Sequence, residues 1–397
     1  MRYLIIAINY FPEVTACAPY TTDMAEHLAA EGHTVSVLTT MPHYPEWRVA
    51  SEYKNADSHT EILNGVTVRR IRTYIPSAMN ALTRGRYELE FLLRGLWATR
   101  NQRVDCLIAV SPSWSDMAIA AIRRRTETHF KVLVQDLMAA AAEQSGMSGG
   151  RAVASIVAQL EGWCLRRADS IGLISESFRD RVLDFGVNPN VLSFTPNYPQ
   201  SHVTPVDVRE ARAILGWPED KYIVVHTGNM GLKQDLPAVL DSAEVLEKSE
   251  PNVSFYLIGD GSQKPFLAER AASQTNVHFL PLVDDATYST VLGAADALLV
   301  NESPRQVDMS VPSKLTSYEA ARRPIIVRTS FEGATRRAIT DSQSCLWIDA
   351  ADSNSLVDLL QNRDRLRALV VQPRTTSPDA RRGVRMDWAL TAKFGNQ

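Results

Sequence analysis

The sequence has little of what metal-stabilised, secreted or nucleic-acid-binding proteins require. Its cysteines are scattered without a CxxC pair, which argues against structural zinc and favours a reducing compartment. A formal net charge of −3 gives no reason to expect a nucleic-acid partner. Neither internal repeats nor low-complexity tracts occur, and 45% hydrophobic with 22% charged residues is ordinary for a globular enzyme. The cysteines are Cys17, Cys106, Cys164 and Cys345.

Long apolar runs are also missing. No stretch approaches the roughly 20 residues that a membrane-spanning helix needs. The first residues, MRYLIIAINYFPE, contain one basic residue and a short apolar run, so they resemble a first β-strand more than a signal peptide. We therefore expect a soluble, cytoplasmic protein that at most lies peripherally on the inner face of a membrane.

Short apolar runs alternate with helical patterns from end to end, which is typical of βαβ units on parallel sheets. A length of 397 residues exceeds what one core usually holds, so two domains are expected. The predicted fold class is α/β, with two Rossmann-like doubly wound domains. The expected strands are 3–8, 34–39, 66–71, 106–110, 131–134, 170–174 and 191–194, then 223–226, 254–258, 277–279, 297–300, 325–327 and 345–348.

A linker is predicted at 196–207, where three prolines stand among polar residues. We expect an N-terminal domain at 1–200, a C-terminal domain at 208–375 and a tail at 376–397 that returns to the first domain. Ligands of doubly wound sheets bind at the carboxyl ends of the strands. The site should therefore lie on the loops that follow the strands, in a cleft that the two domains face.

The most informative segment is YIVVHTGNMGLKQDL at 222–236, a strand followed by a glycine turn and a helical pattern. Gly228 and Gly231 allow another molecule to approach the backbone closely, and Lys233 stands just before the N-terminal end of the predicted helix. Such a unit suits a phosphate group. An ordinary structural turn is the alternative for so short a match. Similar places at 309–320 and 9–24 favour the phosphate interpretation.

Four stretches together resemble glycosyltransferase family 4, and in particular the bacterial transferases of colanic-acid and fucosamine type. They follow in order along nearly the whole chain. The stretches are INYFPEVTACAPYTTDMAEHLAAEGHTVSVLT at 8–39 with PHYPEWRV at 42–49; VQDL at 134–137; TGNMGLKQDL at 227–236 with LIGDGSQK at 257–264 and NVHFLPL at 276–282; and VPSKLTSYEAARRPIIV at 311–327.

This resemblance implies a retaining enzyme of GT-B architecture, with two Rossmann-like domains facing across a cleft. It would move a sugar from a nucleotide sugar, with a UDP-sugar favoured, to a small-molecule or lipid-linked sugar acceptor. The departing diphosphate carries growing negative charge that must be stabilised. Because the chain contains no DxD sequence, we expect lysines to bind this charge, with no metal ion and no other cofactor.

The resemblance places the donor phosphates on the second domain, against the backbone of Gly228. Lys233 matches the lysine that family members place on the diphosphate, whereas Asn229 replaces their companion arginine. Lys314 and its neighbour Ser313, in the Pro-Ser-Lys sequence, are expected to supply the missing contact. Lys233 and Lys314 are therefore candidate catalytic residues.

Two glutamates of many relatives, one on the sugar and one on the ribose, are absent here. Their positions correspond to Met309 and Ser317, so Ser317 is a ribose-side candidate without charge. Leu282, after the strand at 277–279, is expected to border the base.

On the first domain, Thr15 and Ala16 belong to the loop that approaches the diphosphate in relatives. Asp136 follows a strand and is a candidate catalytic residue, with a helix cap as the alternative. Tyr20 and His43 are acceptor-side candidates, although an isolated histidine is more often a packed residue.

Other functions stay open at this point. A nucleotide-sugar epimerase of the same architecture, or a sugar- or nucleotide-binding protein without activity, would show the same periodicity. Residues 84–100, RGRYELEFLLRGLWATR, mix Leu, Phe and Trp with four arginines and suggest contact with anionic lipid. The alternative is an ordinary amphipathic helix packed on its sheet.

Overall fold

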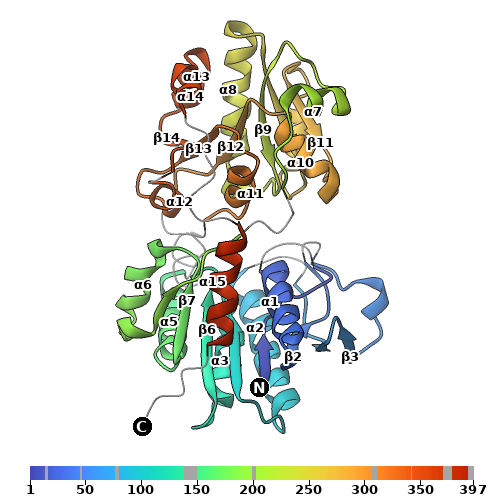
Figure 1. Cartoon of the computed structure of the whole chain (residues 1–397), viewed down its shortest axis with the longest axis vertical. Coiled ribbons are helices and arrows are strands. Elements are labelled where there is room, and N and C mark those ends of the chain that lie inside the picture. The colour runs from blue at the N-terminus through green and yellow to red at the C-terminus, as the bar shows by residue number, and fades with distance from the viewer. Residues whose placement is uncertain are drawn as a thin grey trace. The chain divides into compact units, whose positions relative to one another are not determined.

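A computed structural model describes residues 1–13, 17–44, 47–76, 80–137, 150–198, 203–305, 311–340, 342–369 and 378–391 (Figure 1). The chain divides into two compact units, of which unit 1 comprises Met1–Asn197 with Arg381–Gln397 and unit 2 comprises Tyr198–Ala380. Thr15 and Ala16 lie outside the described residues. Within the part of the chain that the structure describes, no helix is long and apolar enough to cross a bilayer.

Unit 1 is built on an eight-stranded sheet in the order β3-β4-β2-β1-β5-β6-β7-β8. All neighbouring strands are parallel except β3, which pairs antiparallel with β4. The sheet is almost entirely parallel, as expected, and its central strands are apolar because helices cover both faces. The strands are β1 (Arg2–Ile6), β2 (Thr34–Thr40), β3 (Ser58–Leu63), β4 (Val66–Ile71), β5 (Cys106–Val110), β6 (His129–Val134), β7 (Ser170–Leu173) and β8 (Leu192–Phe194).

Strand β3 was not predicted from the sequence. Its side chains are largely exposed, so it lacks the apolar run by which the other strands were found. It joins β4 through Asn64 and Gly65, whose φ angles of 47° and 83° suit a two-residue hairpin turn.

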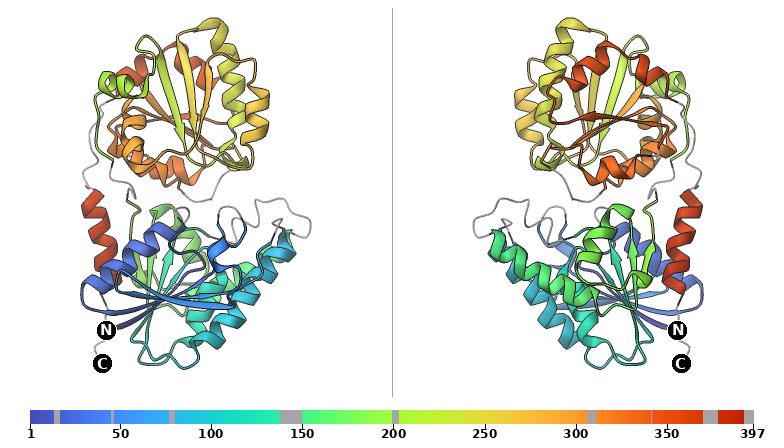
Figure 2. Two further views of the ribbon diagram at one scale, coloured as in Figure 1. Left: turned by 90° about the vertical axis from the view of Figure 1, so that its right-hand side faces the viewer. Right: turned by 90° about the vertical axis from the view of Figure 1, so that its left-hand side faces the viewer.

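The helices of unit 1 form two layers. Figure 2 shows α1 (Ala18–Ala30) and α15 (Pro378–Leu390) on one face of the sheet, and α2 (Ala81–Thr99), α3 (Trp114–Arg123) and α5 (Gly150–Leu165) on the other. The short α6 (Arg179–Asp184) follows β7.

Helix α15 is held on unit 1 by buried cations. The Lys131 ammonium donates to the backbone carbonyls of Trp388, Ala389 and Thr391 at 2.5, 3.0 and 2.7 Å, which satisfies carbonyls that a helix end leaves without partners. Burial lowers the pKa of Lys131 to about 8. The fully buried Arg385 guanidinium donates to the segment that follows β8, which ties the last helix to the end of the first sheet.

Unit 2 has a six-stranded, wholly parallel sheet in the order β11-β10-β9-β12-β13-β14. The two parallel-sheet α/β domains predicted from the sequence are confirmed. The strands are β9 (Tyr222–Thr227), β10 (Val253–Ile258), β11 (Val277–Leu280), β12 (Ala297–Asn301), β13 (Ile325–Thr329) and β14 (Cys345–Asp349). The helices are α7 (Val208–Leu215), α8 (Leu236–Ser249), α9 (Lys264–Arg270), α10 (Asp285–Gly293), α11 (Lys314–Ala320), α12 (Ala334–Ala338), α13 (Ser355–Gln361) and α14 (Asp364–Arg367).

The core of unit 2 lies on both faces of this sheet because successive side chains of a strand point to opposite faces. In β9, Val224 packs with α8, α9 and α13, while Ile223 and Val225 pack with α10 and α11. Burial on both faces fixes the position of β9, and with it the turn that follows.

Candidate functional site

The turn after β9 is interlocked with the turn after β10. Gly228 has φ +99° and donates its N–H to the carbonyl of Ile258 at 2.8 Å. A Cβ atom at Gly259 would lie 2.0 Å from the Gly228 carbonyl oxygen, and one at Gly261 would lie 2.6 Å from Asn229 Oδ1. These close approaches require glycine, so the second turn is the scaffold that shapes the first.

Lys314, the first residue of α11, lies against this turn. Its Nζ atom is 3.2 Å from Nε2 of His226 and would be 3.7 Å from a Cβ at Gly228. Burial lowers the pKa of the Lys314 ammonium to about 7, and the Glu302 carboxylate opposes that shift. The structure therefore brings together two of the predicted site residues, Gly228 and Lys314, which are far apart in the sequence.

Lys233 lies in a short 3₁₀ helix, Leu232–Gln234, with its side chain exposed. Its backbone carbonyl accepts the N–H of Ser303 at 2.9 Å, which ties this segment to the loop after β12. Asn229 is exposed nearby, and its side-chain amide lies 3.4 Å from Oε1 of Gln234.

Glu302 was missed by the sequence analysis. It follows β12 directly, and its Oε2 accepts a hydrogen bond from the Thr329 hydroxyl at 2.8 Å. Burial raises the pKa of Glu302, while the charges of Lys314 and Lys233 act in the opposite direction. The charges of both predicted lysines thus influence this one carboxylate. Its place immediately after a strand was the signal by which it could have been found.

The remaining unit 2 candidates surround this centre less closely. Ser317 is 8% exposed, and it lies in α11 beside Tyr318, whose hydroxyl accepts the N–H of Thr227 at 2.8 Å. Ser313 precedes α11 and is exposed. Leu282 is 68% exposed and follows β11, two strands away from β9 in the sheet.

In unit 1, Asp136 follows β6 at the carboxyl end of its sheet. Its Oδ1 accepts the N–H of Leu137 at 2.9 Å, and its backbone carbonyl accepts the Ser111 hydroxyl at 2.7 Å.

Tyr20 is 3% exposed, and the Arg385 guanidinium lies 5.0 Å from its ring centre. The Tyr20 ring, on α1, therefore packs against Arg385 of α15.

His43 is buried in a closed network. Its Nδ1 lies 2.9 Å from the Met41 carbonyl, its Nε2 lies 3.0 Å from the Tyr87 hydroxyl, and its backbone N–H donates to Glu13 Oε1 at 2.8 Å. Burial lowers the pKa of His43 although the Glu13 carboxylate opposes this. A neutral His43 that donates from Nδ1 and accepts at Nε2 fits both contacts, so the ring supports the loop after β2.

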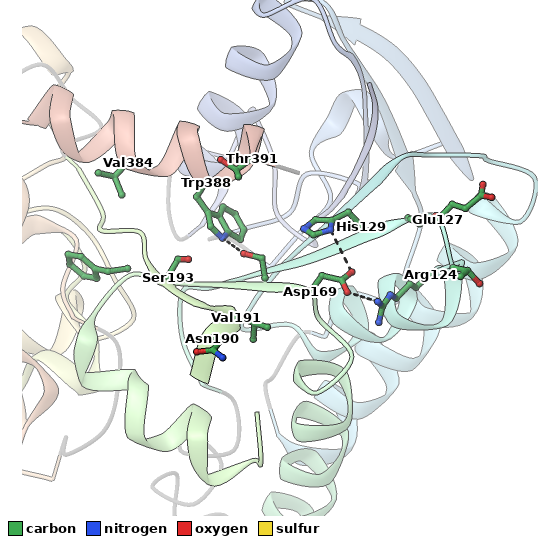
Figure 3. Close-up of a pocket in the computed structure, with 14 residues that line it drawn as sticks. Arg124, Glu127, His129, Asp169, Asn190, Val191, Ser193, Val384, Trp388 and Thr391 are labelled. Atoms are coloured by element: carbon green, nitrogen blue, oxygen red, sulfur yellow. Dashed lines mark hydrogen bonds and ion pairs between the residues drawn. The ribbon is translucent and has the colours of Figure 1, made fainter. Parts of the chain in front are cut away.

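A pocket of about 570 Å³ lies at the end of the unit 1 sheet opposite to the carboxyl ends of its strands (Figure 3). It is lined at the amino ends of β6 and β7 by His129 and Ser170, and by Trp388 of α15. Asp169, on its wall, pairs with Arg124 at 2.5 Å, and the Trp388 indole donates to Ser170 Oγ at 2.8 Å. The pocket contains none of the described residues that were predicted to form the site.

Comparison with family models gives two matches that together cover most of the chain. Residues 15–198 match the Glycosyl transferase 4-like domain, and residues 221–362 match the Glycosyl transferases group 1 domain. Both are transferase families, so the alternative of an epimerase is not favoured.

Known proteins agree with this result. The chain is 31% identical over 333 residues, covering 81% of each protein, to a protein of Escherichia coli (strain K12) named as a colanic acid biosynthesis glycosyl transferase, WcaI. Sucrose-phosphate synthase of Thermosynechococcus elongatus shares the fold with a TM-score of 0.68 at 15% identity, over 98% of this chain and 94% of that one. HepE of Anabaena in complex with UDP has a TM-score of 0.62 at 10% identity, over 98% and 95% of the two chains.

Proposed function

Because the chain belongs to the family 4-type glycosyltransferases with the GT-B fold, we propose that it moves a sugar from a UDP-sugar to an acceptor hydroxyl with retention of anomeric configuration and without a metal ion. The acceptor would be a sugar, free or lipid-linked, in polysaccharide or glycoconjugate assembly. The similarity to WcaI, which is named for colanic acid biosynthesis, supports the polysaccharide role, and the UDP bound to HepE supports the donor.

The main observation behind this proposal is that the Lys314 side chain lies against the Gly228 turn, at the carboxyl end of β9. A diphosphate beside that turn could approach the backbone closely at Gly228, which has no side chain, and would contact the Lys314 amine. Lys233 would approach from the neighbouring 3₁₀ helix. Two lysines would thus stabilise the charge that grows on the leaving diphosphate, which is the task a metal ion performs elsewhere.

Unit 1 would supply the acceptor side. Asp136 stands at the carboxyl end of β6, where a hydroxyl-binding carboxylate would be placed. His43 and Tyr20 would act through packing, because both rings are buried.

Donor and mechanism are tested together. The protein is incubated with a panel of UDP- and GDP-sugars and sugar acceptors, with and without EDTA, and products are detected by mass spectrometry. We expect turnover of a UDP-sugar, full activity in EDTA, and an anomeric proton in the product that matches the donor configuration by NMR. Turnover of GDP-sugars alone, loss of activity in EDTA, or an inverted product would each overturn the corresponding part of the proposal.

Helix α2 favours a peripheral membrane contact. Its solvent-facing side, here called the α2 surface, carries four large apolar side chains beside Arg86, Arg94 and Arg100. Apolar residues normally face the sheet in such a helix, so this outward stripe is unusual. Arg100 lies 4.2 Å from the Trp97 ring centre and Arg86 lies 4.1 Å from that of Tyr74, which places cations around the stripe. The apolar residues are Leu82, Leu89, Leu93 and Trp97, exposed by 85%, 49%, 59% and 63%.

We propose that the α2 surface lies on an anionic bilayer at its cytoplasmic face. The four cysteines are free thiols, which suits that reducing side of the membrane. In flotation with vesicles containing phosphatidylglycerol at low salt, we expect the wild-type chain to float and Leu93→Asp/Trp97→Asp to stay at the bottom. Ile214→Asp, at an exposed site of unit 2, is the matched control and should float. Failure of the wild-type chain to float, or self-association through α2 in its place, rules out the lipid contact.

A further inference from the structure

Beneath the Gly228 turn, β9 carries a polar ring where an apolar side chain would be expected. His226 is fully buried, and it points to the same face of the sheet as Val224 because the two residues lie two positions apart in the strand. Its Nδ1 lies 3.2 Å from the carbonyl oxygen of Leu299. A carbonyl only accepts, so the tautomer that carries its hydrogen on Nδ1 satisfies this contact and leaves Nε2 as an acceptor.

The hydrogen-bonding partner of Nε2 is the Lys314 amine, at 3.2 Å. Burial lowers the pKa of His226 well below its ordinary value, and the charge of Lys314 lowers it further. The imidazole therefore stays neutral and accepts one N–H of Lys314. This contact holds the flexible Lys314 side chain in place, extended from α11 to β9 at the end of the sheet.

The groups that face Lys314 leave its charge only partly compensated. His226 of β9 is neutral, Gly228 has no side chain, and the Glu302 carboxylate after β12 is influenced by the charge of Lys233 as well as by that of Lys314. A partly buried ammonium without a full counter-ion tends to lose its proton. An anion placed beside it has the opposite effect.

We propose that His226 is a positioning residue that holds the Lys314 amine above the Gly228 turn, and that binding of the donor diphosphate is coupled to uptake of a proton by Lys314. This inference rests on the function proposed above and specifies how its donor site works. The proton comes from solvent, and no covalent bond is made or broken. His226 itself stays neutral and does not contact the donor.

The sign of the pH dependence follows from the pKa values. The Lys314 pKa of about 7 belongs to the empty site, and bound diphosphate raises it. Proton uptake on binding is therefore largest between these two values, and donor affinity falls as pH rises through this window. We expect the affinity of the wild-type chain for UDP to fall about tenfold between pH 7 and pH 9 by linkage.

The test is isothermal titration with UDP and GDP at pH 8.0 in two buffers of different ionisation enthalpy, which counts protons taken up. His226→Leu should weaken binding about tenfold, as expected for a lost hydrogen bond to a charged group. His226→Gln keeps an acceptor and should bind within about threefold of wild type. Lys314→Ala should abolish the proton uptake and leave a nearly pH-independent affinity. His278→Leu, on β11, is the matched control and should bind as wild type.

The decisive comparison is the double variant. If His226 acts through Lys314, His226→Leu has no further effect on a chain that already carries Lys314→Ala. An equal loss in both backgrounds, or wild-type affinity of His226→Leu, overturns the inference while the proposed function stands. If neither nucleotide binds the wild-type chain, the proposed donor site itself is wrong and the inference falls with it. Thermal unfolding checks each variant, and the wild-type pH series needs no variant at all.

Discussion

The carboxyl ends of the two sheets both carry polar clusters, but the clusters differ in how their charges are satisfied. In unit 1, the buried Glu13 accepts N–H groups from His43, Tyr44 and Asn9 at 2.8, 2.9 and 2.7 Å. In unit 2, the Lys314 amine faces a neutral imidazole, and the charges of Lys314 and Lys233 both influence the Glu302 carboxylate. The first cluster is closed on itself and holds loops in place, whereas the second is proposed to bind an external anion. Changes in the unit 2 cluster should therefore affect donor binding, and changes in the Glu13 cluster of unit 1 should affect stability.

The largest effect is expected for the two lysines. Lys233→Ala and Lys314→Ala should each lower kcat/KM for the nucleotide sugar by on the order of a hundredfold, because a charge contact that strengthens in the transition state is lost. Lys233→Arg should keep more activity than Lys233→Ala. Steady-state kinetics provides the measurement. Lys221→Ala, at the amino end of β9, is the control and should behave as wild type. Wild-type rates for both alanine variants would mean that the donor site lies elsewhere.

Glu13→Gln tests the closed cluster. An amide replaces one of the two acceptor oxygens by a donor that faces N–H groups, so the free energy of unfolding should fall by about 2 kcal/mol. Urea unfolding measures this change. UDP affinity should stay within twofold of wild type, and the exposed Glu127→Gln should alter neither property. A large loss of UDP affinity at unchanged stability would show that the Glu13 cluster takes part in donor binding and does not merely stabilise unit 1.

Asp136→Asn separates the two sides of the reaction. Because Asp136 is proposed to contact the acceptor hydroxyl, its amide should raise the acceptor KM about tenfold, the cost of one charged hydrogen bond. UDP affinity should not change. Initial-rate kinetics with varied acceptor gives the first value, and titration gives the second. If acceptor binding and UDP binding were weakened equally, Asp136 would contact the donor instead of the acceptor alone.

The smallest effect is expected at the surface. Arg382 pairs with Asp23 through two contacts of 2.8 and 2.7 Å, but both side chains are partly exposed. Arg382→Ala should therefore cost only about 0.5 kcal/mol of stability and leave kcat/KM unchanged. Lys131→Met, which removes the cation at the end of α15, is the comparison and should cost more. Equal losses in urea unfolding would show that the ion pair matters as much as the buried lysine.

Most of the sheet was predictable, and the exception is instructive. The buried parallel strands were found because their apolar runs are continuous, as burial on both faces demands. Strand β3 was missed since its exposed side chains show no such run. The Asn64-Gly65 pair was the available signal, because both residues adopt the positive φ of a hairpin turn.

At the site, the glycine turn and the two lysines were predicted, whereas His226 and Glu302 were not. A histidine inside an apolar strand looks like a core residue until the side chain opposite it is known. Glu302 stands alone after a strand, and neither composition nor spacing relates it to Lys314 or Lys233.

The amino-acid sequence alone was enough to predict the alternation of strands and helices, the two α/β domains, the transferase family and the position of the glycine turn. These features depend on local periodicity and on motifs that are contiguous in the chain. The tertiary structure was needed to show that Lys314 reaches His226 across 88 positions of sequence and lies against Gly228, and that the charges of two lysines influence Glu302. The physical reason is that parallel pairing brings the carboxyl ends of β9 and β12 together, and pairing order is set by the packing of whole sheets rather than by any one segment.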